Sequence, residues 1–283
     1  MSVRIIIDST TDVSPAYQNR VRVVPLTIRF GDTELIDGVT VSRQRFYEML
    51  VESDELPTTS QASPAAFERE YASAAQAGDS AVVLTISAQL SGTHQSACIA
   101  AQDFENVVVV DSQSATIGAG ILAQYAVDCA ERGMPAAEIA ARLEEKRDDV
   151  CVIALLDTLE YLKRGGRISK TAAIAGGLLN LKPVASIENG RVTVIGKARG
   201  SRQGNNLLMQ KIRDCGGVDF DLPVLLGYTG LSDALLCKYM EDSRAVWEGH
   251  ADALPQVQVG SVIGTHGGPG AVVAAFFRKG SRA

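Results

Sequence analysis

Runs of apolar residues alternate along the first half of the chain with segments in which apolar positions recur at helical spacing. Strands are predicted for the apolar runs at residues 4–7, 21–30, 81–86, 107–110 and 150–155. Helices are predicted where apolar positions lie three and four residues apart, over residues 42–51, 64–77, 92–101 and 115–131. Because strands and helices alternate, the pattern predicts an α/β fold.

The predicted strands are apolar at consecutive positions, as in the four valines of residues 107–110. A strand with apolar side chains on both faces belongs to a sheet that is covered on both sides, which is typical of parallel sheets. We therefore predict a largely parallel sheet in an N-terminal α/β domain over residues 1–157. In such open sheets, ligands bind at the carboxyl ends of the strands.

The rhythm changes after Asp157, where residues 159–168 indicate a short helical turn ended by paired glycines. We place the domain boundary here and predict a smaller C-terminal α/β domain over residues 158–283. Asn189-Gly190 is the signature of a type I′ turn and predicts a hairpin over residues 186–194, hence a mixed sheet. The remaining predicted elements are helices over 201–215 and 232–247, strands over 223–228 and 256–259, and a final helix after Pro269.

Composition limits the class of protein. The chain has 283 residues, 46% of them hydrophobic, yet no apolar run approaches the ~18–20 residues of a membrane span. The first residues lack the pattern of a signal peptide, so a cytoplasmic location is expected. The five cysteines are an odd number without a C-x-x-C pair and are interpreted as reduced thiols. Without an apolar surface stripe or heptad pattern, a monomer is expected.

Charge is unevenly distributed. The net charge of −6 argues against general nucleic-acid binding. Residues 163–213 nevertheless hold eleven Lys and Arg against one acid, Glu188, which leaves the remainder at −16. Such a segment is either an ordinary solvated surface or a docking patch for an acidic or phosphate-bearing partner.

Three hydroxyl-rich segments, residues 58–61, 90–94 and 264–270, are candidates for one anion-binding site. They contain Thr59, Ser91 and His266, and we interpret all three segments as loops. Serine, threonine and histidine side chains, with exposed backbone N–H groups, hold a small anionic head group without a full positive charge buried beside it. A carboxylate is the predicted ligand group.

Ordinary structural roles account for part of these motifs. Ser63 is a good helix N-cap, and Ser91 lies at or near the start of a predicted helix. Ser91 also resembles a hydrolase nucleophile in its strand-loop-helix position, although the G-x-S-x-G motif is absent. Asp8 is expected to hold its loop by accepting backbone N–H bonds. The chain has no H-x-x-x-H motif or carboxylate cluster, so we predict no metal.

Six motifs, in order along essentially the whole chain, resemble the DegV family of bacterial fatty-acid-binding proteins. They are Asp8-Ser-Thr-x-Asp12, Pro57-Thr-Thr-Ser-Gln61, Ile86-Ser-x-x-Leu-Ser-Gly-Thr93, Leu159-Glu-Tyr-Leu-Lys-Arg-Gly-Gly-Arg-Ile168, Leu181-Lys-Pro183 and Ile263-Gly-Thr-His-x-Gly-Pro-Gly270. The resemblance implies a two-domain α/β protein that holds one long-chain fatty acid, such as palmitate, in a tunnel near the domain junction. It implies no cofactor and no catalytic activity of the chain's own.

The resemblance also implies roles for individual residues. Thr59 and Ser91 would contact the carboxylate, with His266 supporting them, while Arg167 and Arg199 would lie on a surface that faces a separate ATP-dependent fatty acid kinase. That kinase would convert the carboxylate to an acyl phosphate. Two departures from the family pattern, His94 where an aromatic is common and Gly267 where valine is common, are expected to alter the tunnel mouth.

Two other classes of function compete with this interpretation. One is a serine-dependent acyl hydrolase or acyltransferase, with Ser91 as nucleophile and His266 as base. The other is a DNA-binding regulator that uses the basic segment, which the net acidity and the absence of a helix-turn-helix pattern disfavour.

Overall fold

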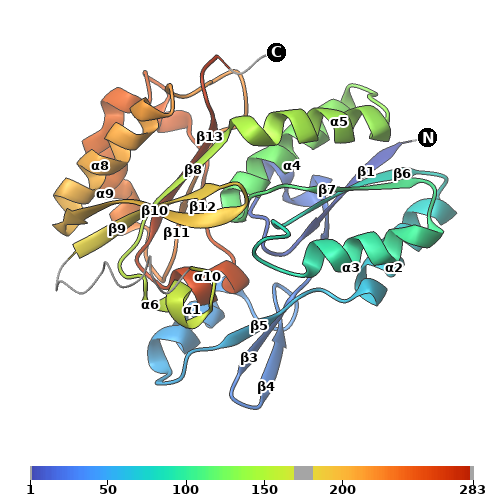
Figure 1. Ribbon diagram of the computed structural model, residues 1–283, viewed down its shortest axis with the longest axis horizontal. Helices are drawn as coiled ribbons and strands as arrows, with labels where there is room; N and C mark the ends of the chain where they lie inside the picture. Colours follow the sequence, from blue (N-terminus) through green and yellow to red (C-terminus); the bar gives the residue numbers. More distant parts are fainter. Residues whose placement is uncertain (1, 169–180, 281–283) are drawn as a thin grey trace.

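The computed structural model describes residues 2–168 and 181–280, which form three β-sheets with helices packed against them (Figure 1). The first sheet contains four parallel strands in the order β2-β1-β6-β7. Its strands are β1 (Val3–Asp8), β2 (Arg22–Val24), β6 (Ser80–Thr85) and β7 (Val107–Asp111). The parallel sheet predicted for the N-terminal half is therefore confirmed.

Helices cover both faces of this sheet, as the continuous apolar strands predict. Ile5 and Ile7 of β1 pack into one buried cluster with α4 (Thr116–Glu131) and α5 (Ala136–Lys146). Ile6, between them, faces a second cluster on the opposite side. That second cluster is built by α1 (Arg43–Glu52), α2 (Pro64–Gln76) and α3 (Thr93–Ala100).

The single strand predicted over residues 21–30 is wrong, because the chain forms two strands that belong to different sheets. β2 ends at Val24, and Pro25, which has no N–H to donate, separates it from β3 (Thr27–Phe30). β3 pairs antiparallel with β4 (Thr33–Ile36) and β5 (Thr58–Ser60). The predicted loop around Thr59 is therefore a strand, with Thr59 opposite Ile28.

The third sheet is mixed and has six strands in the order β10-β9-β8-β13-β11-β12. Its strands are β8 (Val150–Leu155), β9 (Leu181–Glu188), β10 (Arg191–Arg199), β11 (Leu225–Tyr228), β12 (Gln256–Gln258) and β13 (Val272–Phe277). The predicted hairpin is confirmed, since β9 and β10 pair antiparallel around Asn189 and Gly190, which have φ values of 50° and 76°. Both positive φ values are those of a type I′ turn.

The final helix predicted after Pro269 is wrong. Residues 272–277 form β13, a central strand between β8 and β11, and all six of its side chains are buried. The helix instead precedes Pro269 as α10 (Ser261–Gly267) and contains the predicted Gly-Thr-His loop. A short apolar run with both faces buried has no periodicity that separates strand from helix.

Helix α4 packs against strands of both large sheets. It contacts β1 and β6 of the parallel sheet and β8, β11 and β13 of the mixed sheet. One buried cluster accordingly combines Val82 with Val152 and Val273. β8, which was predicted to belong to the N-terminal domain, pairs instead with β9 and β13 of the mixed sheet. The predicted domain boundary between residues 157 and 158 stays a prediction.

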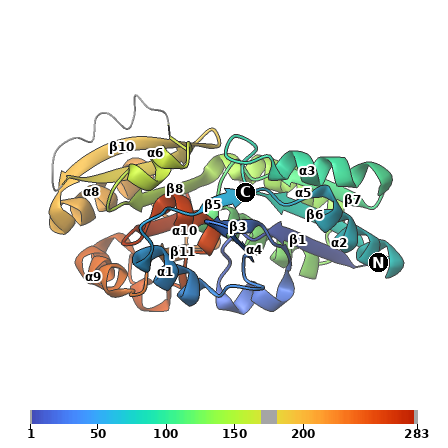
Figure 2. The same ribbon diagram turned by 90° about the horizontal axis from the view of Figure 1, so that it is seen from below.

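The other helices surround these sheets. They are α6 (Glu160–Arg164), α8 (Gly200–Asp214), α9 (Ala234–Ser243) and the 3-10 helices Pro15–Arg20, Ala101–Asp103, Arg147–Asp149, Arg244–Val246 and Ala251–Ala253. In a second view, α10 lies beside β3 and β5 near the middle of the molecule (Figure 2). Segments more than 200 residues apart therefore meet here.

Candidate functional site

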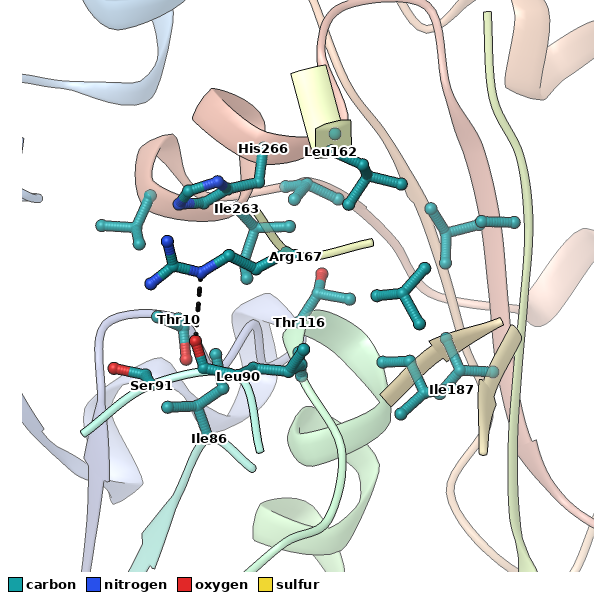
Figure 3. Close-up of a pocket in the computed structure, with 18 of the residues that line it drawn as sticks. Thr10, Ile86, Leu90, Ser91, Thr116, Leu162, Arg167, Ile187, Ile263 and His266 are labelled. Atoms are coloured by element: carbon teal, nitrogen blue, oxygen red, sulfur yellow. Dashed lines mark hydrogen bonds between the residues drawn. The ribbon is translucent and has the colours of Figure 1, made fainter. Parts of the chain in front are cut away.

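Thr59, Ser91 and His266 line a single cavity between the two large sheets. Figure 3 shows Ser91 and His266 in its wall. Thr59 comes from β5, Ser91 from the turn before α3, and His266 from the last turn of α10. Gly264 lets α10 pack closely on α1, because a Cβ at this position would lie 2.6 Å from Tyr47 Oη. The structure thus brings together the three side chains predicted to form one site.

His266 is joined directly to Thr59. Its Nε2 lies 2.8 Å from Thr59 Oγ1, whereas its buried Nδ1 has no hydrogen-bond partner among the described residues. Burial, and secondarily the positive charge of Arg167, lower the pKa of His266 to about 4. The imidazole is therefore neutral at neutral pH, and it orients the Thr59 hydroxyl by a hydrogen bond rather than by charge.

Ser91 belongs to a second hydroxyl pair at the start of α3. Its Oγ accepts a hydrogen bond from Thr93 N at 3.2 Å and lies 2.9 Å from Thr93 Oγ1. Gly92, between them, is the N-cap of α3, and a Cβ there would lie 2.1 Å from Gln61 Oε1. In the Ser91-Gly92-Thr93 sequence, the bonds to Thr93 thus fix the Ser91 hydroxyl, and the missing side chain of Gly92 lets the Gln61 side chain lie close to the backbone.

No described hydrogen bond joins Ser91 to His266. The two side chains instead bond separately to Thr93 and Thr59. A serine nucleophile needs a base within hydrogen-bonding reach. The described geometry therefore gives no support to the hydrolase alternative.

Arg167 also lines the cavity, which the residue pattern alone did not indicate. Its Nε donates to Leu90 O at 3.1 Å (Figure 3). Its Nη1 donates to Gly165 O at 2.7 Å. These bonds hold a half-buried guanidinium beside the three predicted site residues. The guanidinium therefore adds a positive charge beside the hydroxyl groups, which the interpretation from the three hydroxyl-rich segments did not include.

Arg199, the other predicted partner-binding residue, lies outside this cavity. It is exposed at the end of β10, where its backbone N–H donates to Gln203 Oε1 at 3.1 Å. Lys170, counted in the basic segment, lies outside the described residues. The structure brings Arg167, but not Arg199, to the side chains of the candidate site.

Beyond these polar groups, the cavity is lined mainly by aliphatic side chains. Its wall includes one face of the mixed sheet, where Ala154 pairs with Ala185 and Val192 pairs with Ile187. The small alanines leave space along the sheet, and larger side chains flank them. Further apolar lining comes from Leu26, Ile86, Leu90, Val152, Leu156, Leu162, Val259, Val262, Ile263 and Val273. The cavity is therefore mainly apolar, with Ser91, Arg167 and His266 on one side of it (Figure 3).

A second, more polar pocket of about 570 Å³ lies against that side of the cavity. Thr59, Arg167 and His266 line both spaces and form the wall between them. Arg164 and Tyr161 add polar groups to this outer pocket. A ligand head group held at the wall would therefore lie next to a space that admits other molecules.

The two departures from the family pattern differ in position. Gly267 lines the cavity, and its expected effect on the mouth stays a prediction. His94 does not, because its ring bonds to Thr85 Oγ1 at 3.0 Å and to Cys98 Sγ at 3.5 Å. The sequence also did not indicate Thr10 and Thr116 as lining residues. Thr10 bonds to Asp8, which accepts backbone N–H groups of Thr10 and Ile86 as predicted for a loop-holding carboxylate.

The described residues also show whether the protein could hold a metal ion or cross a membrane. Within residues 2–168 and 181–280, no group of three or more His, Cys, Asp or Glu side chains is arranged to hold a metal ion. None of the helices in this part of the chain is long and apolar enough to cross a membrane. The site offers a mainly apolar cavity with hydroxyl, imidazole and guanidinium groups in its wall.

Fold and site together define a class of α/β proteins with a mainly apolar cavity between two large sheets. Residues 2–279 match the family model described as an uncharacterised protein of the DegV family. The chain belongs to the DegV family. A DegV domain-containing protein of Deinococcus radiodurans is 34% identical over 283 residues, which cover 98% of each chain.

Solved structures share the fold. A DegV family protein from Thermus thermophilus, described by its fatty acid binding, has a TM-score of 0.85 and 33% identity, covering 98% of this chain and 100% of that one. The fatty acid kinase B3 protein of Streptococcus pneumoniae, solved with linoleic acid, has a TM-score of 0.86 and covers 99% of this chain and 100% of that one. Its identity is 21%, so this second similarity establishes a shared fold.

Proposed function

We propose that this protein binds one long-chain fatty acid and presents its carboxylate to a separate ATP-dependent kinase, which forms an acyl phosphate. The observation that carries the proposal is the pair of adjoining spaces, an apolar bore and an open polar pocket, separated by Thr59, Arg167 and His266. The fatty acid binding of the Thermus thermophilus relative supports the ligand class. In this proposal, the chain itself carries out no chemical step.

The head-group interactions follow from the hydrogen bonds at the wall. We assign the ring proton of His266 to Nε2, because a proton on the buried Nδ1 would have no acceptor among the described residues. His266 then donates to Thr59 Oγ1, which leaves the hydroxyl hydrogen of Thr59 for a carboxylate oxygen. Ser91 gains the same freedom when Thr93 donates to it. Arg167 supplies the positive charge that balances the carboxylate.

The tail supplies most of the affinity in this proposal. Burial of a sixteen-carbon chain at ~0.8 kcal/mol per CH₂ gives on the order of 10 kcal/mol before ordering costs. A charged hydrogen bond contributes about 1.5–3 kcal/mol. The polar end therefore fixes direction and position, and the bore holds the molecule.

The phosphoryl transfer step would occur from the outer pocket. A carboxylate at the wall would expose an oxygen to the γ-phosphorus of a nucleotide that the kinase holds. Phosphoryl transfer concentrates negative charge, which Arg164 and Arg167 would help to balance. The basic segment that includes Arg199 would then contact the kinase outside the pocket.

The first test is denaturing mass spectrometry of lipid extracted from protein purified without added ligand. We expect about one free fatty acid per chain, and its conversion to acyl phosphate when the DegV-associated kinase of a relative and ATP are added. Absence of lipid, together with no binding of added palmitate, would exclude the ligand. A covalent acyl group on Ser91 would instead support the hydrolase.

A further inference from the structure

Two glycines, Gly165 and Gly166, follow one another at the end of helix α6, and they differ in backbone conformation. Gly166 has a φ of 70°, in the left-handed region that favours glycine. Gly165, the C-cap residue, has φ −69° and ψ −10°, a right-handed conformation that any L-residue adopts. Alanine is the better helix former in such a conformation. The backbone therefore requires a glycine at position 166 but not at position 165.

The imidazole of His266 occupies the space into which a side chain at position 165 would project. A Cβ at Gly165 would lie 2.9 Å from His266 Cε1 and closer still to Nδ1. A carbon atom cannot approach the ring this closely unless one of the two groups moves. Gly165 thus packs directly against the Nδ1 side of the ring, and this buried nitrogen has no hydrogen-bond partner among the described residues.

The backbone of Gly165 is held by hydrogen bonds on both sides. Its N–H donates to Tyr161 O at 2.9 Å, and its carbonyl accepts from Arg167 Nη1 at 2.7 Å. The N–H groups of the next two residues also donate to carbonyls of α6, at 3.1 and 2.9 Å. The imidazole, in contrast, turns about side-chain bonds and is oriented by its hydrogen bond to Thr59. A methyl group added at position 165 should therefore displace the ring rather than the loop.

Helix α10 makes the reciprocal contact with α6. Its C-cap residue, Gly268, has a φ of 71°, and a Cβ there would lie 2.8 Å from Cγ of the Tyr161 ring. Each helix thus ends in a glycine that packs against a ring carried by the other helix. This close approach determines how far the ring of His266 reaches toward Thr59.

We propose that Gly165 is a positioning residue of the site, because its missing side chain makes room for the His266 ring and its carbonyl holds the Arg167 guanidinium. The proposal rests on the proposed function, in which both groups act at a fatty acid carboxylate. Gly165 lines the outer pocket and not the apolar cavity. A larger residue at this position should therefore disturb the head group and leave the place of the tail unchanged.

The first test is NMR of the histidine ring nitrogens in delipidated full-length protein, with the His266 signals assigned by their loss in His266→Ala. We expect one tautomer, protonated at Nε2, in the wild type. Gly165→Ala should lose this signature, because the displaced ring no longer bonds to Thr59. The control Gly166→Ala adds the same methyl group where no atom lies within 4 Å. It should lower the Tm, since its φ is positive, and keep the His266 signals.

The second test is a double-mutant cycle on palmitate binding. Gly165→Ala and His266→Ala should each raise the Kd about tenfold, since the Thr59 hydroxyl loses its orientation. In the His266→Ala background there is no ring to displace, so Gly165→Ala should change the Kd by less than about twofold. An equal rise of the Kd in both backgrounds would overturn the proposal, as would unchanged His266 signals in Gly165→Ala.

The same cycle decides the question if Gly165→Ala alone fails to fold. The double variant should then recover a cooperative thermal transition, because the colliding ring is absent. A double variant that also fails to fold would show that position 165 acts on the fold independently of His266. A wild type that binds no palmitate would refute the proposed function, whereas the NMR comparison needs no ligand and would still test the contact between Gly165 and His266.

Discussion

Asp12 Oδ1 accepts a hydrogen bond from the backbone N–H of Gly260 at 3.0 Å, although 248 residues separate them. The same buried carboxylate accepts from Thr116 Oγ1 at 2.8 Å and pairs with Arg43 Nη2 at 2.8 Å. Gly260 is the N-cap of α10, the helix that ends at the His266 side of the candidate site. One carboxylate in the loop after β1 therefore holds the start of that helix.

We predict that Asp12→Ala destabilises the protein by about 3–5 kcal/mol. It removes the ion pair of the half-buried Arg43, which retains its bond to Gln258 O, and it takes away the acceptor of the Thr116 hydroxyl and of the Gly260 N–H. Asp12→Asn keeps an acceptor of the same shape and should cost clearly less. Urea unfolding measures both changes. The matched control is Asp32→Ala at an exposed loop position, and equal effects at positions 12 and 32 would contradict the assigned role.

The proposed head-group contacts predict a defect in binding without loss of folding. Thr59→Ala with Ser91→Ala should raise the Kd for palmitate about 10–100-fold, since each hydroxyl bonded to a charged group contributes about 1.5–3 kcal/mol and part of this is recovered by water. Acyl phosphate formation should fall further, because the carboxylate loses its fixed position. Fluorescent fatty acid displacement measures the first change, with exposed Thr33→Ala as control.

We predict that burial of His266 makes the folded protein less stable as the pH decreases. Burial lowers its pKa from 6.5 to about 4, so between these values the unfolded chain binds a proton that the folded protein does not. The free energy of unfolding should therefore fall as pH decreases through this window, by about 3 kcal/mol for this group. In delipidated protein, the stability difference between wild type and His266→Gln should shift by that amount. A difference that is constant from pH 7 to 4 would contradict the prediction.

Because Ala154 and Ala185 leave space along the cavity wall, substitutions there should change the length of fatty acid that the protein binds. Ala185→Leu would fill space beside the bore and exclude about two methylenes, which at ~0.8 kcal/mol each lowers palmitate affinity about tenfold. Ile187→Ala should act in the opposite direction and admit longer chains. The chain-length distribution of extracted fatty acids measures both variants, and identical distributions would show that these residues do not limit the tail.

The sequence predicted best what depends on local chemistry. The parallel strands β1, β6 and β7 follow from apolar side chains on both faces, and the β9–β10 hairpin follows from Asn189-Gly190. Strand β13 was predicted as a helix because its six consecutive buried residues carry no distinguishing period. Its partners β8 and β11 come from distant parts of the chain, so only tertiary pairing selects the strand.

In the candidate site, too, residue types were predictable from the sequence, whereas tertiary contacts were not. Thr59, Ser91 and His266 were predicted from hydroxyl and glycine patterns, and the structure brings all three to one cavity. The place of Arg167 depends on bonds to Leu90 O and Gly165 O, and backbone acceptors are not visible in residue types. The bond of His94 to Thr85 depends in the same way on the packing of α3 against β6.

Helix α4 is surrounded by other elements over most of its length, since twelve of its sixteen residues are buried. Both large sheets rest on it, and its burial is complete only while both are folded. Loss of either sheet would expose apolar surface that the other needs covered. The free energies of the two halves are therefore linked, and the chain should melt as one cooperative unit.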